Sequence, residues 1–187
     1  KKKNKNIFTI HIQDPKINFN NFNIIVAPEH DGIKGENVIN SKGAIHYITE
    51  EEIEKSKTYL IDKVQSQKVV ALILGGPNKY YSFDNEEISK IFNQIKESFI
   101  YNGYKAIIVP SMRTPKKTIE LAKKEFENDG YVVTEVNKQA YLSSLAIASN
   151  IVITCDSTSM ISEAAISGKP IFVAHMKNKR NNYRFKK

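Results

Sequence analysis

Residues 151–164 read IVITCDSTSMISEA, in which an apolar run is followed by polar residues and then by a helical pattern. The opening run is continuously apolar, which is typical of a strand that is covered on both faces in a parallel sheet. The polar residues follow where that strand ends, and the apolar spacing beyond them predicts a helix over 159–167. A strand that leads through a short turn into a helix is the repeating unit of an α/β fold.

The same alternation of strand and helix continues on both sides of this segment. The predicted strands are 8–13, 23–27, 69–74, 106–109, 131–136, 151–154 and 170–173. The predicted helices are 49–63, 86–102, 115–128, 140–148 and 159–167. Strands that alternate with helices favour βαβ units. We therefore predict an α/β protein with a Rossmann-like parallel sheet and helices on both of its faces.

The composition changes between Gly32 and Gln67, first to Gly, Asn, Ser and Lys and then to an acidic helical pattern. Such a change is typical of a segment that joins two domains. We predict that residues 1–48 are the end of a truncated amino-terminal Rossmann-like unit, together with a linker. Residues 49–187 would then form a nearly complete carboxyl-terminal unit with the order βαβαβαβαβ.

The composition excludes several classes of protein. A chain of 187 residues, 41% of them hydrophobic, can bury one good core and the edge of a second. The single cysteine, Cys155, cannot form an internal disulfide or a cysteine-based metal site. The apolar runs are far shorter than the roughly 20 residues of a membrane span, and no secretory signal follows the basic start. We expect a cytoplasmic location, with peripheral contact to the inner membrane face left open.

The net charge of +8 bears on the kind of ligand. Much of the excess lies in residues 1–6 and 177–187, and basic side chains do not alternate with aromatic ones on one face. This distribution favours solvated termini and disfavours nucleic-acid binding. A basic balance still favours an anionic ligand, either a nucleotide diphosphate or an acidic membrane surface.

The polar residues after the strand 151–154 are the strongest candidate for a binding site. Asp156, Ser157 and Ser159 lie where a strand meets a helix, so backbone N–H groups and hydroxyls would converge at a helix amino terminus. Glu163 lies further into the helix, where its carboxylate would accept hydrogen bonds from the hydroxyls of a ribose. The alternative is that Asp156 and Ser157 only cap the helix, and that Glu163 is an acidic residue that suits the helix dipole.

The loop Gly75-Gly76-Pro77-Asn78 follows the predicted strand 69–74. Glycines let a backbone approach a ligand closely, and a following turn can present N–H groups to a phosphate. The loop lacks the G-x-G-x-x-G spacing of a dinucleotide fingerprint. A tight turn without a ligand is therefore an equally good interpretation.

The loop Ser111-Met112-Arg113-Thr114 follows the predicted strand 106–109. Arg113 precedes a helix and would bind a diphosphate with two hydrogen bonds, although an ion pair with a neighbouring acid is the simpler interpretation. Because parallel strands of an open α/β sheet present their carboxyl ends at one edge, we expect this loop to meet the loops after 69–74 and 151–154. This convergence is the main argument from the residues for a ligand site.

Glu29, His30 and Asp31 follow another predicted strand, 23–27. Imidazoles titrate near neutral pH, so His30 or Asp31 would supply a general base in a cleft. One alternative is a divalent-metal site, which no second cluster at ligand spacing supports. The other is a turn in which Asp31-Gly32 reverses the chain. We predict no bound metal.

Six motifs, in order along the chain, resemble the mitochondrial-fission Elm (elongated mitochondria) family. They are His11-Ile-Gln-Asp-Pro15, Pro28-Glu-His-Asp-Gly32, Gly43-Ala44-Ile45-His46, Gly75-Gly-Pro-Asn78, Pro110-Ser-Met-Arg-Thr-Pro115 and Asp156-Ser-Thr-Ser-Met-Ile-Ser-Glu-Ala164. The resemblance covers nearly the whole chain. It implies two Rossmann-like halves similar to those of GT-B glycosyltransferases, of which this chain would hold the carboxyl-terminal half and the end of the other.

The resemblance also implies a ligand and its contacts. In GT-B enzymes the carboxyl-terminal half binds a nucleotide-sugar, and an acidic residue early in a late helix holds the ribose; Glu163 matches that position. Ser157 and Ser159 would then meet the diphosphate, while Gly76 and Asn78 would line the cleft. The expected binding residues are Gly75, Gly76, Asn78, Ser111, Arg113, Thr114, Asp156, Ser157, Ser159, Met160 and Glu163, with His30 and Asp31 as catalytic candidates.

Three functions are compatible with these features. The first is a GT-B-like protein that binds a nucleotide-sugar, needs no further cofactor, and transfers the sugar to an acceptor in bacterial envelope glycan synthesis. The second is a non-catalytic adaptor of the Elm type that acts through protein or membrane contacts. Its basic tail, Lys177-Asn178-Lys179-Arg180 with Tyr183 and Phe185, would dock on anionic lipid. The third, a nicotinamide-dependent oxidoreductase, is disfavoured because no G-x-G-x-x-G fingerprint is present.

Overall fold

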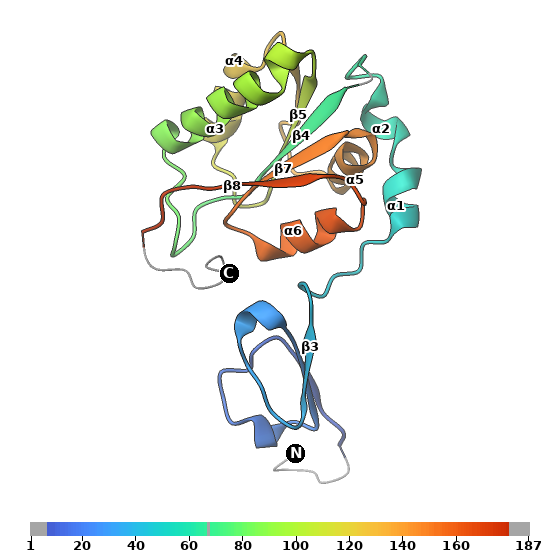
Figure 1. Cartoon of the computed structure of the whole chain (residues 1–187), viewed down its shortest axis with the longest axis vertical. Coiled ribbons are helices and arrows are strands. Elements are labelled where there is room, and N and C mark those ends of the chain that lie inside the picture. The colour runs from blue at the N-terminus through green and yellow to red at the C-terminus, as the bar shows by residue number, and fades with distance from the viewer. Residues whose placement is uncertain (1–6, 67, 180–187) are drawn as a thin grey trace. The chain divides into compact units, whose positions relative to one another are not determined.

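Figure 1 shows a computed structural model of the chain, and the structure describes residues 7–66 and 68–179. These residues fall into two compact units, with the boundary between Tyr47 and Ile48. We call the described residues before this boundary unit 1 and those after it unit 2. The candidate ligand-binding loops all belong to unit 2, whereas His30 and Asp31 belong to unit 1.

Unit 2 is built on a five-stranded parallel sheet. Its strands are β4 (Val69–Leu74), β5 (Lys105–Pro110), β6 (Gly130–Val132), β7 (Asn150–Thr154) and β8 (Ile171–Ala174), in the spatial order β6-β5-β4-β7-β8. A helix connects each strand to the next one along the chain. The predicted Rossmann-like sheet and its βαβαβαβαβ order are therefore confirmed.

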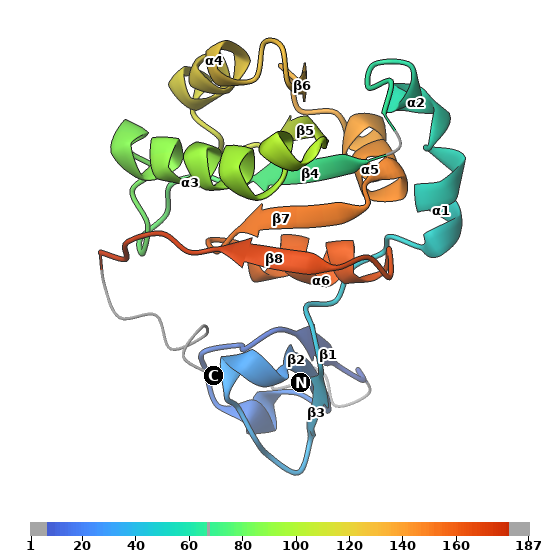
Figure 2. The same cartoon turned by 45° about the horizontal axis from the view of Figure 1, so that its top comes forward.

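Helices cover both faces of this sheet, as Figure 2 shows. One face carries α3 (Asn85–Ser98) and α4 (Lys116–Glu125), and the other carries α1 (Glu50–Lys55), α2 (Thr58–Ile61), α5 (Lys138–Ile147) and α6 (Thr158–Ala165). The central strand β4 is buried along its whole length and alternates its side chains between the two cores, with Val70 on the α3 face and Ala71 on the opposite one. A continuous apolar run is what a strand in this position requires.

The helices of unit 2 begin where the sequence offers capping side chains. Asp84, Asn137 and Ser157 each accept a backbone N–H from the first turn of α3, α5 and α6. The predicted helix 49–63 is instead two short helices, α1 and α2. Ser56 lies at the break, and its hydroxyl donates to the carbonyl of residue 52, a local bond that competes with helix continuation.

Several element ends in unit 2 differ from the prediction, and two of these lie close to the candidate loops or at the sheet edge. The strand predicted over 131–136 ends at Val132, because β6 lies at an edge of the sheet and the polar residues after it are exposed. The helix predicted to begin at Pro115 begins one residue later, with Pro115 as its N-cap. Neither difference moves a candidate binding residue away from the end of its strand.

Unit 1 contains a three-stranded parallel sheet with the order β1-β2-β3. Its elements are β1 (Ile10–Ile12), β2 (Ile24–Pro28), β3 (Val38–Ser41) and the 3-10 turns η1 (Phe19–Asn21) and η2 (Glu29–Asp31). The sequence prediction missed β3, because its four residues include only two apolar ones and lie in a segment rich in Gly and Asn. The pairing with β2 is what orders this segment.

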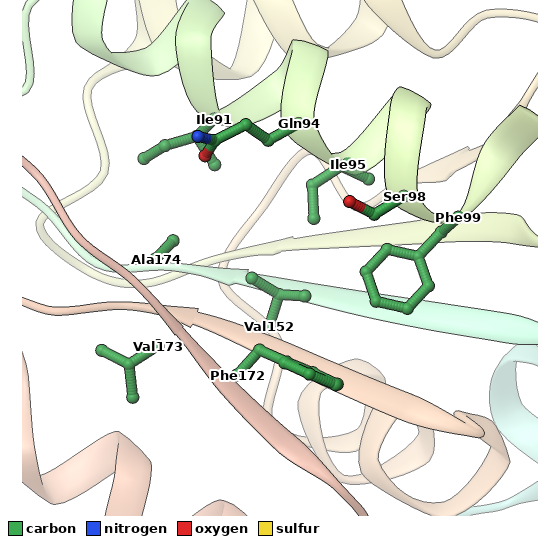
Figure 3. Close-up of a pocket in the computed structure, with 9 residues that line it drawn as sticks. All are labelled: Ile91, Gln94, Ile95, Ser98, Phe99, Val152, Phe172, Val173 and Ala174. Atoms are coloured by element: carbon green, nitrogen blue, oxygen red, sulfur yellow. The ribbon is translucent and has the colours of Figure 1, made fainter.

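An apolar groove runs along unit 2 between α3 and the strands β7 and β8, as Figure 3 shows. Its volume is about 300 Å³. The lining residues are Ile91, Gln94, Ile95, Ser98, Phe99, Val152, Phe172, Val173 and Ala174. The rings of Phe99 and Phe172 lie 5.9 Å apart at its floor, and the Phe172 residue is 50% exposed. The groove is thus a sheet face that α3 covers only in part.

Candidate functional site

Three loops of unit 2 meet at the carboxyl edge of its sheet. They are residues 75–78 after β4, 111–114 after β5 and 155–159 after β7, and we call them the loop cluster. The strands β4 and β7 are neighbours although β5 and β6 separate them along the chain, so the strand order reverses at this point. Open α/β sheets bind ligands at such reversals. The expected convergence of the three loops is present.

Asp156 is the residue that ties the three loops together. Its side chain is fully buried, and its carboxylate accepts hydrogen bonds from the N–H of Gly76 at 3.0 Å and from the hydroxyl of Thr154 at 2.7 Å. It also accepts from Nη2 of Arg113 at 2.7 Å. A buried carboxylate is stable when donors surround it in this way. Since these donors surround the carboxylate, Asp156 holds the loops in place, and its side chain is not available for a ligand.

The two glycines after β4 are required by close packing. A Cβ on Gly75 would overlap the carboxylate oxygens of Asp156, and one on Gly76 would overlap the backbone carbonyl of Arg113. Their N–H groups are already used, since Gly75 donates to the hydroxyl of Thr154 at 2.8 Å and Gly76 donates to Asp156. These glycines therefore let the loops approach one another, and in this arrangement their N–H groups do not face a free phosphate position.

Asn78 and Thr114 also stabilise the loops from within. The Asn78 side chain accepts the N–H groups of Tyr80 and Tyr81 and donates to the carbonyl of Asp156 at 3.2 Å. The Thr114 hydroxyl lies within hydrogen-bond distance of the carbonyls of residues 74 and 75, and it accepts the N–H of Ser111 at 2.8 Å. Thr114 thus stabilises the turn from which Arg113 projects, and Asn78 ties the loop after β4 to the loop after β7.

Arg113 has guanidinium N–H groups that are not used within the loop cluster. Its Nη1 donates to the carbonyl of Gly76 at 2.9 Å while Nη2 donates to Asp156, and the side chain is 41% exposed. Among the described residues, no group accepts from Nε or from the second hydrogen of either terminal nitrogen. A guanidinium fixed by two hydrogen bonds with further N–H groups toward solvent is suited to an oxyanion.

The amino terminus of α6 lies beside Arg113 in the loop cluster. Ser157 is its N-cap, and the side-chain oxygen accepts the N–H of Met160 at 3.4 Å. Within the described part of the chain, the hydroxyls of Thr158 and Ser159 have no hydrogen-bond partner. The first N–H groups of a helix point out of its end and carry the positive end of its dipole. Arg113 and α6 thus offer positive charge and donors from two directions.

Glu163 follows on α6 and contacts α5. Its Oε2 accepts a hydrogen bond from the hydroxyl of Tyr141 at 3.1 Å, and the residue is half-buried. Burial is the main cause that raises the pKa of Tyr141 above the ordinary value, and the nearby charge of Glu163 adds to it. The Tyr141 hydroxyl therefore remains protonated and acts as a donor to Glu163.

His30 and Asp31 lie in unit 1, in the turn η2 that follows β2. The His30 Nε2 and the Asp31 Oδ1 are 3.9 Å apart, and both side chains are largely buried. The loop cluster consists of unit 2 residues only, so these two remain separate candidates. Residues 7–66 and 68–179 contain no group of three or more His, Cys, Asp or Glu side chains placed to hold a metal ion.

The basic tail is only partly visible. Lys177 donates its backbone N–H to Glu87 at 3.0 Å, and Lys179 donates its own to the carbonyl of Tyr80 at 2.6 Å. Residues 180–187, which include the aromatic side chains expected to touch lipid, lie outside the described residues. No helix of the described chain has the length and apolar character needed to cross a membrane.

The sequence did not predict Thr154 and Tyr141 as site residues, although both make hydrogen bonds to candidate site residues. Thr154 reads as an ordinary β-branched strand residue, yet its buried hydroxyl bridges Gly75 and Asp156. Tyr141 reads as one more large side chain on an apolar helix. A polar residue at the last position of a buried strand was the available signal for Thr154; no signal marked Tyr141.

Comparisons with known proteins identify a family and relatives of the chain. A family model described as "Mitochondrial fission ELM1" matches residues 1–187. "Uncharacterized protein RP120" of Rickettsia prowazekii (strain Madrid E) is 28% identical over 225 residues, which cover 95% of this chain and 60% of the relative. "Mitochondrial fission protein ELM1" of Arabidopsis thaliana is 23% identical over 196 residues, covering 90% and 46% respectively. The chain thus spans about half the length of the curated relatives it matches.

Proposed function

The chain belongs to the mitochondrial fission ELM1 family, and from this premise we propose that unit 2 binds a nucleotide-sugar with its diphosphate against Arg113 and the amino terminus of α6. The observation that carries the proposal is the state of Arg113. Its guanidinium is held by Asp156 and Gly76 while its remaining N–H groups face solvent beside a helix start. Pre-oriented donors of this kind bind phosphate oxygens without reorganising.

The other expected contacts divide into two groups under this proposal. Gly75, Gly76, Asn78, Thr114 and Asp156 shape the loops, since they are bonded to one another. Ligand contacts come from the exposed residues Arg113 and Ser159, from the half-buried Ser157 and from the helix N–H groups. Ser111 and Met160, which are also half-buried, lie beside them. Glu163 holds the ribose, as the GT-B resemblance implies.

Sugar transfer is the reaction that this ligand would serve. A general base removes the proton from an acceptor hydroxyl. His30 and Asp31 stay the candidates from the sequence for that role, and the structure describes them within unit 1 alone. The acceptor oxygen then forms a bond to the anomeric carbon as the bond from that carbon to the diphosphate oxygen breaks. Arg113 and the α6 dipole stabilise the negative charge on the departing diphosphate. The proposed setting is bacterial envelope glycan synthesis.

Isothermal titration calorimetry of the purified protein with UDP- and GDP-sugars tests this proposal, because both carry the diphosphate. We expect saturable binding of one class, weakened on the order of 10-fold in Arg113→Gln because a charge-assisted bidentate contact is lost. Lys123→Gln removes an exposed positive charge at the far end of α4 and is the matched control, with unchanged affinity. Absence of binding by both classes would overturn the proposal, as would equal affinities of the Arg113 and Lys123 variants.

A further inference from the structure

Tyr141 and Glu163 form a pair that the sequence motifs do not predict. Tyr141 lies in the first turn of α5, and Glu163 lies on α6. Both helices begin at the carboxyl edge of the sheet, because each follows a parallel strand. The Tyr141 ring packs against the hydrophobic core on that face, and only its hydroxyl reaches the carboxylate, at 3.1 Å. A packed ring is a fixed point from which to orient a flexible acidic side chain.

The hydrogen bond leaves Glu163 with one oxygen in use and one available. Within residues 7–66 and 68–179, no group donates to Oε1 of Glu163. Ser159 precedes Glu163 by four residues, so the two lie on the same face of α6, about 6 Å apart along its axis. Since Ser159 is exposed at the helix start, this face leads from the anion position to the free oxygen of Glu163.

The rise of about 6 Å between Ser159 and Glu163 is compatible with a nucleotide, in which the ribose joins the diphosphate through a single methylene group. A carboxylate acts only as an acceptor when ionised, and both ribose hydroxyls are donors. Removal of one hydroxyl from the ligand leaves an acceptor of the site unpaired, so the site discriminates against the deoxy form.

The ribose contact of Glu163 is the one that the GT-B resemblance implies. Beyond it, we propose that Tyr141 is a positioning residue, which orients the Glu163 carboxylate toward the ribose hydroxyls and thereby sets the preference for a ribonucleotide over a deoxyribonucleotide. This inference rests on the proposed function, because it assumes that a nucleotide occupies the loop cluster. The raised pKa of Tyr141 agrees with it, since the phenol keeps the proton that it donates.

Titration calorimetry with UDP, dUDP, GDP and dGDP tests the inference on wild type, Tyr141→Phe and Glu163→Gln. We expect wild type to prefer the ribonucleotide of the bound base on the order of 10-fold. In Tyr141→Phe the ring remains and only the oxygen is lost, so the preference should fall below about 3-fold. The reason is that the ribonucleotide, with two hydroxyls on Glu163, should lose more affinity than the deoxynucleotide, which has only the 3′-hydroxyl there. Glu163→Gln should abolish the preference too, and it decides the matter if Tyr141→Phe does not fold.

Tyr104→Phe is the matched control. Its hydroxyl is also a half-buried hydrogen-bond partner, accepting from Asn150 at 3.3 Å, but it lies at the opposite, amino-terminal edge of the sheet near the start of β5. We expect it to keep the wild-type preference. If wild type binds none of the four nucleotides, the proposed function fails together with the inference. If wild type binds but shows no preference, or if Tyr141→Phe keeps it or weakens both ligand forms equally, the inference alone is overturned.

Discussion

At the scale of single residues, the site depends on one buried carboxylate. Asp156 accepts from three loops or strand ends and so fixes where Arg113 lies. The sequence predicted that Asp156, Gly76 and Arg113 would meet, because they follow strands of one parallel sheet. It did not predict that the loop residues would use their polar groups on one another, with Gly76 donating to Asp156 and Gly75 linked to it through Thr154. The backbone dihedral angles of the loops decide which way these groups point, and the residue types do not specify those angles.

Gly75→Ala is expected to destabilise the protein by about 2–3 kcal/mol, since its Cβ would overlap the buried Asp156 carboxylate and force the loops apart. The comparison is Gly168→Ala, whose Cβ would meet open space but whose φ is 64°. Backbone strain alone should cost that variant about 1 kcal/mol. Urea unfolding measures both; equal losses would show that Gly75 is not constrained by the carboxylate.

At the scale of elements, the sequence predicted best where the apolar pattern and the caps agree. The strand β4 has its predicted bounds, and α3 begins within one residue of its prediction with Asp84 as N-cap. It ends four residues earlier than predicted, and a 3-10 turn, η3 (Ile100–Asn102), takes up most of the remainder. Prediction failed where the outcome depends on something other than the apolar pattern, either a tertiary contact or a local side-chain bond. The strand β3 exists through its pairing with β2, and the break between α1 and α2 depends on a side-chain bond to the backbone.

The helix α4 carries a stability test in Thr118. This residue is 1% exposed, and its hydroxyl has no hydrogen-bond partner. An unpaired buried hydroxyl is unfavourable, so Thr118→Val, which keeps the shape, should stabilise the protein by about 1 kcal/mol. Thr118→Ser keeps the hydroxyl and removes the methyl group, and it should destabilise by about 1 kcal/mol.

Thermal and urea unfolding of the two Thr118 variants check this pair of expectations. For a chain of this size, 1 kcal/mol corresponds to a shift in melting temperature of roughly 2–4 °C. A Thr118→Val variant less stable than wild type would mean that the hydroxyl has a partner in solution.

At the scale of the whole molecule, the family and the fold class follow from the sequence, whereas the activity does not. Six motifs at strand ends carry the resemblance, and the sheet order places three of them together. A Rossmann-like sheet hosts many reactions, so the fold by itself does not distinguish sugar transfer from binding without transfer. The decision depends on what Arg113 and the start of α6 bind.

Nuclear magnetic resonance of the ¹⁵N-labelled protein, titrated separately with UDP and with GDP, is the most direct measurement of that contact. The expected result is that, with the nucleotide that binds, the largest shift changes fall on the amides of Ser157, Thr158 and Ser159 and on Nε of Arg113, because the diphosphate would sit between them. Changes centred instead on the groove around Phe172, or none in the loop cluster with either nucleotide at high concentration, would contradict an anion site at this edge of the sheet.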